Sequence, residues 1–129
     1  SGCCALCVAD AELESAALAV GLAGAGVGPD RATVTYAGSQ LLDVVAPEVD
    51  KGYGVRRACE LLDIDPGQVV AFGDGPNDLA LFRAVGLSVA MANADPAVLA
   101  TADLVAGSNV EEGVAGMLAE LGLVAAEAA

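Results

Sequence analysis

The stretch VVAFGDGPNDLALFRAVG, residues 69–86, decides the fold. Residues 69–72 are apolar and predict a buried strand, and a helical pattern of apolar residues begins a few positions later. Between the two lies a glycine-rich turn that holds Asp74, Asn77 and Asp78. The glycines on either side of Asp74 permit a sharp change of direction. The stretch therefore predicts a strand, a tight polar turn and a helix.

The sequence on both sides of this stretch alternates between strands and helices. Such alternation implies a parallel sheet with helices on its faces. In such sheets the ligand crevice lies beyond the carboxyl ends of the strands, so Asp74 and Asp78 are expected to face one crevice. The expected strands are 68–72, 87–91 and 103–107, and the expected helices are 53–62, 78–85, 96–102 and 110–121.

The first 46 residues have a different pattern. A strand is expected over residues 4–9, a helix over 11–25 with Asp10 as its cap, and a hairpin from strands 32–37 and 41–46. This is an α+β unit with antiparallel strands. We therefore expect two modules, residues 1–46 and 47–129.

Composition limits the function classes. The 129 residues are 56% hydrophobic and have a net charge of −13, which repels nucleic acid and anionic lipid headgroups. The longest uncharged run, residues 15–29, is too short to span a membrane, and no basic, apolar leader precedes it, so a cytoplasmic location is expected. An acidic protein that binds a phosphate ester would need a divalent cation to bridge the negatively charged protein and the negatively charged phosphate.

The four cysteines, Cys3, Cys4, Cys7 and Cys59, do not form a recognisable metal site. The first three could belong to a zinc or redox site, but a second ligand pair is missing and the chain has no histidine. We expect reduced thiols that pack as small apolar residues. The absence of histidine also removes Ser-His-Asp and Cys-His catalysis.

The polar turn has two interpretations. Capping of a helix explains one acidic residue, whereas two acids and an amide between glycines suit a hard cation such as Mg²⁺. Lys51 is placed at the first turn of a predicted helix, where the macrodipole opposes an ammonium group unless an anion lies nearby. An exposed lysine without function is the plain alternative. Together, the lysine and a metal on one rim would form a site for a phosphoryl group.

Four motifs in order resemble a known family. They are Lys51-Gly52, FGDGPND at 72–78, VAMANADPAVLATADLV at 89–105, and SNVEEGV at 108–114. Over residues 41–123 the chain resembles the C-terminal part of the haloacid dehalogenase (HAD) superfamily, and within it the Cof-type sugar-phosphatase branch. The resemblance implies the C-terminal half of a Rossmann-like, three-layer α/β core, preceded by a remnant of an α+β cap domain over residues 1–46.

The resemblance also implies roles for particular residues. Lys51 would steady the phosphoryl group and the nucleophile, and Asp74 would bind Mg²⁺. Asp78 would complete the metal site, Asn77 would help bind the phosphate, and Asn93 would lie in a loop beside the active site. The implied substrate is a small phosphorylated metabolite, a sugar phosphate in this branch, with no nucleic acid or membrane partner.

The family mechanism needs an aspartate nucleophile in a D-x-D motif on the first core strand, which forms an aspartyl-phosphate. The one triplet with this spacing, residues 63–65, follows a helix and precedes Pro66, so we expect a turn there. We therefore expect this chain to be a C-terminal piece that is inactive alone. The strand ending at Phe72 would then have an unpaired edge, covered by another copy or by the missing N-terminal segment.

Other functions remain open. A signalling receiver domain also combines acidic residues with a lysine, but its acidic pair comes first, whereas here Lys51 precedes Asp74. A glycine-rich nucleotide loop would present bare amides in place of these acids. The alternative to a phosphatase is a catalytically inactive HAD-like binding or regulatory domain. The missing nucleophile supports this alternative, whereas the intact set of Lys51, Asp74, Asn77 and Asp78 weakens it.

Overall fold

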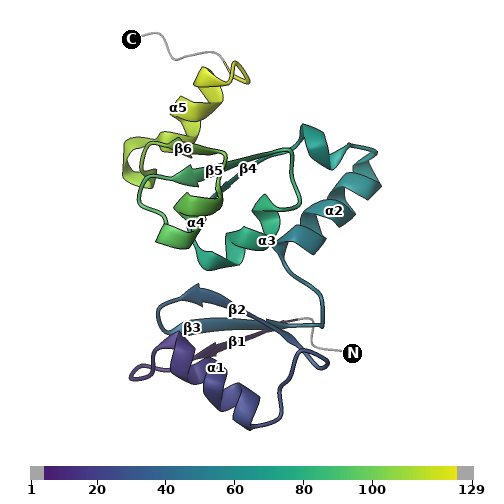
Figure 1. Cartoon of the computed structure of the whole chain (residues 1–129), viewed down its shortest axis with the longest axis vertical. Coiled ribbons are helices and arrows are strands. Elements are labelled where there is room, and N and C mark those ends of the chain that lie inside the picture. The colour runs from purple at the N-terminus through teal and green to yellow at the C-terminus, as the bar shows by residue number, and fades with distance from the viewer. Residues whose placement is uncertain (1–4, 125–129) are drawn as a thin grey trace.

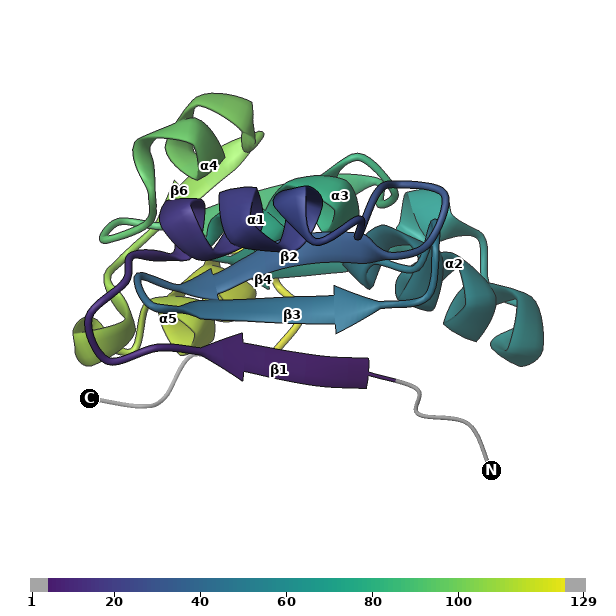
Figure 2. The same cartoon turned by 90° about the horizontal axis from the view of Figure 1, so that it is seen from below.

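The computed structural model describes residues 5–124, which form two separate sheets, one from each part of the chain (Figure 1). The N-terminal sheet, called here the cap sheet, has the order β1-β3-β2, and both of its pairings are antiparallel. Helix α1 packs on one face of the cap sheet, and the other face is turned toward the second half of the chain (Figures 1 and 2). The elements of this unit are β1 (Ala5–Ala9), α1 (Ser15–Gly24), β2 (Thr33–Gly38) and β3 (Leu41–Val45).

The second half contains the parallel sheet that the sequence predicts. The strand order is β4-β5-β6, and both pairings are parallel. Three short 3-10 turns cover residues 66–68, 76–78 and 109–111. The helices and strands are α2 (Lys51–Leu62), β4 (Val70–Gly73), α3 (Leu79–Phe82), β5 (Leu87–Met91), α4 (Pro96–Thr101), β6 (Leu104–Ala106) and α5 (Gly113–Glu120).

Side chains of β5 point alternately to the two faces of the parallel sheet, and helices cover both faces, so this half of the chain has three layers. Ala90 packs with Phe82 and Val98 under α3 and α4, whereas its neighbours Val89 and Met91 pack with residues of α5 on the opposite face. Figure 1 shows α3 and α4 on one side of the sheet and α5 on the other. The predicted α/β fold with a parallel sheet is therefore confirmed.

One edge of the parallel sheet is open. Within residues 5–124, β4 pairs with β5 alone, so its second edge has no partner strand. This is the edge that the sequence analysis expects to be unpaired. Helix α2 extends away from the sheet beside it (Figure 1), and its apolar Leu61 and Leu62 are 72% and 67% exposed. The helical spacing of the sequence places Val55, Ala58, Cys59 and Leu62 on one face of this helix. Cys59 is buried, whereas Ala58 and Leu62 are exposed, because the described residues pack only against the side that contains Cys59.

Two helix starts differ from the sequence predictions. Asp10 does not cap α1: its Oδ1 accepts N–H bonds from Glu12 and Leu13, which close a turn, and the helix begins at Ser15. The last helix begins at Gly113, because residue 112 has a left-handed backbone with φ of 55° that interrupts the helix. The apolar spacing of the sequence places Val110 on the same face as Val114 and Met117, but Val110 precedes the helix and is 86% exposed.

A hydrogen-bonded clamp joins β5 to the start of β6. Both the backbone N–H and the hydroxyl of buried Ser88 donate to Oδ2 of Asp103, at 2.9 and 2.6 Å. In the opposite direction, the backbone N–H of Asp103 donates to the Ser88 hydroxyl at 3.1 Å. These bonds stabilise the carboxylate and lower the pKa of Asp103 below its usual range.

Cysteine placement agrees in part with the expectation of packed thiols. Cys59 is a buried free thiol, whereas Cys7 is free and exposed on β1. Cys3 and Cys4 lie outside the described residues. In the described part of the chain, no helix has the length and apolar character that a membrane crossing requires.

Candidate active site at the end of β4

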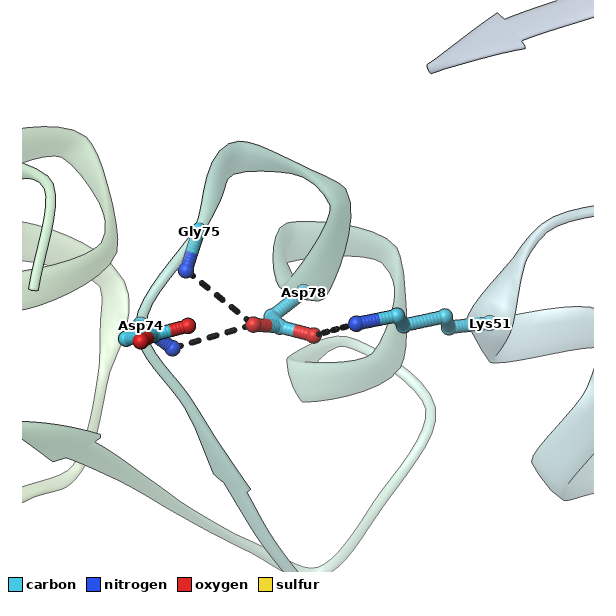
Figure 3. Close-up of polar contacts among 4 residues, drawn as sticks. All are labelled: Lys51, Asp74, Gly75 and Asp78. Carbon is cyan, nitrogen blue, oxygen red and sulfur yellow. Dashed lines mark hydrogen bonds and ion pairs between the residues drawn. The ribbon is translucent and has the colours of Figure 1, made fainter. Parts of the chain in front are cut away.

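The polar turn after β4 is closed by the carboxylate of Asp78. Its Oδ2 accepts the backbone N–H groups of Asp74 and Gly75, at 3.0 and 3.1 Å (Figure 3). The Asp78 side chain is only 5% exposed. A Cβ at position 73 would lie 2.6 Å from the Asp78 Cβ, so the strand must end in glycine for the carboxylate to fold back in this way.

The second oxygen of Asp78 binds Lys51. The Lys51 ammonium, at the first residue of α2, donates to Asp78 Oδ1, and the two are joined as an ion pair (Figure 3). An anion therefore lies beside the lysine that the helix dipole opposes, as the sequence argument requires. The Lys51 side chain is 50% exposed and its other donors remain available.

Asp74 is held by its backbone, and its carboxylate is exposed. Its N–H donates to Asp78, and its C=O accepts the N–H of Asp95 at 2.9 Å. Among residues 5–124, no hydrogen bond or ion pair engages the Asp74 carboxylate. The two backbone bonds therefore fix the position of a carboxylate that is free to bind something else.

A cavity of about 430 Å³ lies between this turn and the cap sheet. It unites the predicted residues Lys51, Asp74 and Asn77, but Asp78 is turned away into the loop and does not line it. The opposite wall comes from the start of α1 and the turn between β2 and β3. The lining residues are Ser15, Tyr36, Ala37, Gly38, Ser39, Lys51, Asp74, Gly75, Pro76, Asn77 and Asp95.

A smaller cavity of about 200 Å³ adjoins the first, since Lys51 and Asn77 belong to both linings. It reaches along the cap sheet toward the connection between the two halves of the chain. Its lining residues are Thr35, Asp43, Val45, Val49, Asp50, Lys51 and Asn77.

Asn93 does not line either cavity. Its Oδ1 accepts the backbone N–H of Asn109 at 3.1 Å, which joins the loop after β5 to the loop after β6. The residue of this loop that reaches the larger cavity is Asp95, which the sequence analysis did not single out. The sequence does contain one indication that Asp95 has a defined position. It directly precedes Pro96 at a predicted helix start, where aspartate is a favoured cap.

The side chains around the turn offer few ligands for a metal ion. In the described residues, no group of three or more His, Cys, Asp or Glu side chains is placed to hold a metal ion. Mg²⁺, however, keeps several waters and binds through one or two carboxylates plus substrate phosphate. The free, fixed carboxylate of Asp74 fits one such ligand position.

Comparison with known proteins identifies the family. The model of the haloacid dehalogenase-like hydrolase family matches residues 25–118. This is more than half of the chain, so the chain belongs to the haloacid dehalogenase-like hydrolases. The superfamily resemblance stated from the motifs is therefore confirmed.

Individual relatives include two phosphatases. The 5-amino-6-(5-phospho-D-ribitylamino)uracil phosphatase YbjI of Escherichia coli is 46% identical over 79 residues, covering 61% of this chain and 29% of the relative. A phosphoglycolate phosphatase of Methanopyrus kandleri is 52% identical over 73 residues, covering 57% and 32%. The chain therefore spans less than a third of the length of each of these relatives.

A solved structure supports the fold over nearly the whole chain. The haloacid dehalogenase-like hydrolase from B. subtilis superposes with a TM-score of 0.80 at 26% identity. The match covers 92% of this chain and 40% of that one.

Proposed function

We propose that this chain supplies the lysine and the metal-binding turn of a Mg²⁺-dependent phosphatase. The substrate is a small phosphorylated metabolite, most simply a sugar phosphate. The observation that supports this is the meeting of Lys51 and Asp74, from different elements, in one cavity beneath the cap sheet. The phosphatases among the relatives support the same reaction class.

The three residues of the cavity have different tasks in this proposal. The Lys51 ammonium and the Asn77 side chain bind phosphoryl oxygens, and Lys51 neutralises charge that grows on them during transfer. Asp74 holds the metal. Bound Mg²⁺ would supply a second positive charge for the phosphoryl oxygens.

Asp78 was expected to be a metal ligand. We propose that it instead holds the residues of the metal site in place. Both of its oxygens already accept hydrogen bonds within the turn. It joins the Lys51 ammonium to the backbone of Asp74, so the group that binds phosphate and the group that binds metal are kept at a fixed spacing. Asn93 is proposed to act further out, by joining the loops after β5 and β6.

The nucleophile is proposed to lie outside this sequence. The triplet Asp63-Ile64-Asp65 forms the predicted turn: Asp63 ends α2 in a left-handed conformation, and Asp65 accepts the N–H of Gly67 at 2.8 Å. We propose that an aspartate on a strand beside the open edge of β4 forms the aspartyl-phosphate. That strand comes from an N-terminal segment of a longer protein, because a second copy of this sequence would bring no D-x-D strand. The division of the chain after residue 46 and a cytoplasmic location stay predictions.

The test uses the protein expressed from its complete gene, assayed with p-nitrophenyl phosphate. Activity should require Mg²⁺ and return after chelation when Mg²⁺ is restored. Asp74→Asn should reduce kcat by at least about 100-fold. The matched control is Asp63→Asn, which removes the same charge at a left-handed helix end where Asn is well tolerated and which lines neither cavity.

Two results would contradict the proposal. Asp74→Asn with control-level activity would remove Asp74 from the reaction. Absence of turnover by the complete, folded protein with Mg²⁺ would favour the alternative, an inactive HAD-like binding or regulatory domain. The open edge of β4 and the absence of a D-x-D strand are the observations that keep this alternative in view.

A further inference from the structure

The wall opposite Lys51 is built by the cap sheet. The face of this sheet away from α1 is turned toward the second half of the chain (Figure 1). Thr35 and Asp43, from β2 and β3, line the smaller cavity with Lys51 and Asn77. A phosphate bound at Lys51 would therefore lie beside a cavity whose cap-side wall includes these two residues.

A polar row crosses the cap sheet at this wall. Asp43 on β3 is paired in register with Cys7 on β1 and with Thr35 on β2. Residues directly opposite one another in antiparallel strands project from the same face. The Cys7 thiol donates to Asp43 Oδ1 at 3.1 Å, and this bond, together with the negative charge of Asp43, raises the pKa of Cys7.

The charges of the two cavities are unbalanced. Within the described residues, Lys51 is the one cation in either lining, and it is already paired with Asp78. Asp74 lines the larger cavity, but in the proposed function the metal offsets its charge. The remaining carboxylates are Asp95 in the larger cavity and Asp43 and Asp50 in the smaller one. Once Lys51 and the metal hold the phosphate, an anionic leaving group would therefore meet carboxylates and no further cation from the two linings.

We infer that this site prefers phosphate esters with an uncharged, hydroxylated leaving group, and that Asp43 is a specificity-determining residue that disfavours leaving groups with a carboxylate. A carboxylate such as Asp43 accepts hydrogen bonds from hydroxyl groups and repels another carboxylate. This inference rests on the proposed phosphatase function. It separates this chain from the relatives whose named substrate, phosphoglycolate, has an anionic leaving group.

The test compares two substrates with the same carbon skeleton, glycerol 3-phosphate and 3-phosphoglycerate. They differ only in a hydroxymethyl group against a carboxylate. The protein expressed from its complete gene should have a kcat/KM for glycerol 3-phosphate that is at least about 10-fold higher. Asp43→Asn should reduce this ratio about three- to tenfold, mainly by improving kcat/KM for 3-phosphoglycerate, because one repelling charge is removed from the rim of the cavity.

Controls separate the possible failures. Glu120→Gln removes a charge from the end of α5, outside both linings, and should leave the ratio unchanged. A wild-type ratio of one or below, with p-nitrophenyl phosphate hydrolysed normally, would overturn this inference and leave the phosphatase intact. An unchanged ratio in folded Asp43→Asn would overturn the role of Asp43. Loss of p-nitrophenyl phosphate hydrolysis in the wild type would overturn both proposals.

Discussion

The substitution Gly52→Ala tests how closely helix α2 packs against the backbone of α3. A Cβ built there would lie 2.4 Å from the Ala80 carbonyl oxygen, so reaching an ordinary contact of 3.4 Å requires a displacement of about 1 Å. Forcing such a shift in a packed region typically costs about 1–3 kcal/mol. The higher helix propensity of alanine opposes this cost by about 0.5–1 kcal/mol.

Gly54→Ala is the matched control, because it lies in the same helix and its Cβ would meet nothing within 4 Å. It should stabilise the chain by about 0.5–1 kcal/mol. The two variants should therefore differ in free energy of unfolding by about 1–3 kcal/mol, with Gly52→Ala the less stable. Urea unfolding followed by far-UV circular dichroism measures both. Equal stability, or a more stable Gly52→Ala, would refute the close approach of α2 to Ala80.

Two further predictions concern charged side chains. Because the pKa of Asp103 is lowered, its bonds to Ser88 should stabilise the fold above the unfolded pKa of about 3.9, and this contribution should be lost as pH falls through the lower folded value. Asp103→Ala should therefore destabilise the chain at pH 7 but converge with wild type in strong acid; a constant difference across pH would contradict the clamp. For the ion pair, a double-mutant cycle of Lys51→Met and Asp78→Asn should give a coupling energy of about 1 kcal/mol, modest because Lys51 is half exposed. A coupling near zero would contradict a stabilising ion pair between these two side chains.

The parallel sheet and the position of the site could be predicted from the sequence because both depend on local pattern. Buried strands followed by glycine turns and helices determine where a carboxyl edge must lie. Lys51, Asp74 and Asn77 accordingly share one cavity. The spacing of Asp78 was compatible with two orientations, toward the cavity or toward its own turn. The choice depends on the backbone amides of Asp74 and Gly75, which no residue pattern specifies.

Other features could not be predicted because they depend on contacts between distant segments. The start of α1 is set by the N–H of Ser15, which donates to the carbonyl of Ser39 at 2.7 Å across the cap unit. The row of Cys7, Asp43 and Thr35 exists only once two strand registers are known. A shift of one residue in either pairing would turn its partner to the opposite face.

The open edge of β4 offers a spectroscopic reporter of whatever completes the sheet. Successive residues of a strand direct their backbone groups to alternate sides, so some amides of β4 face β5 and others face the open edge. Amides on an uncovered edge exchange hydrogen with solvent quickly, whereas those in a ladder are protected. Amide exchange along Val70–Gly73 would therefore register the arrival of a partner strand residue by residue, at the strand that leads into Asp74.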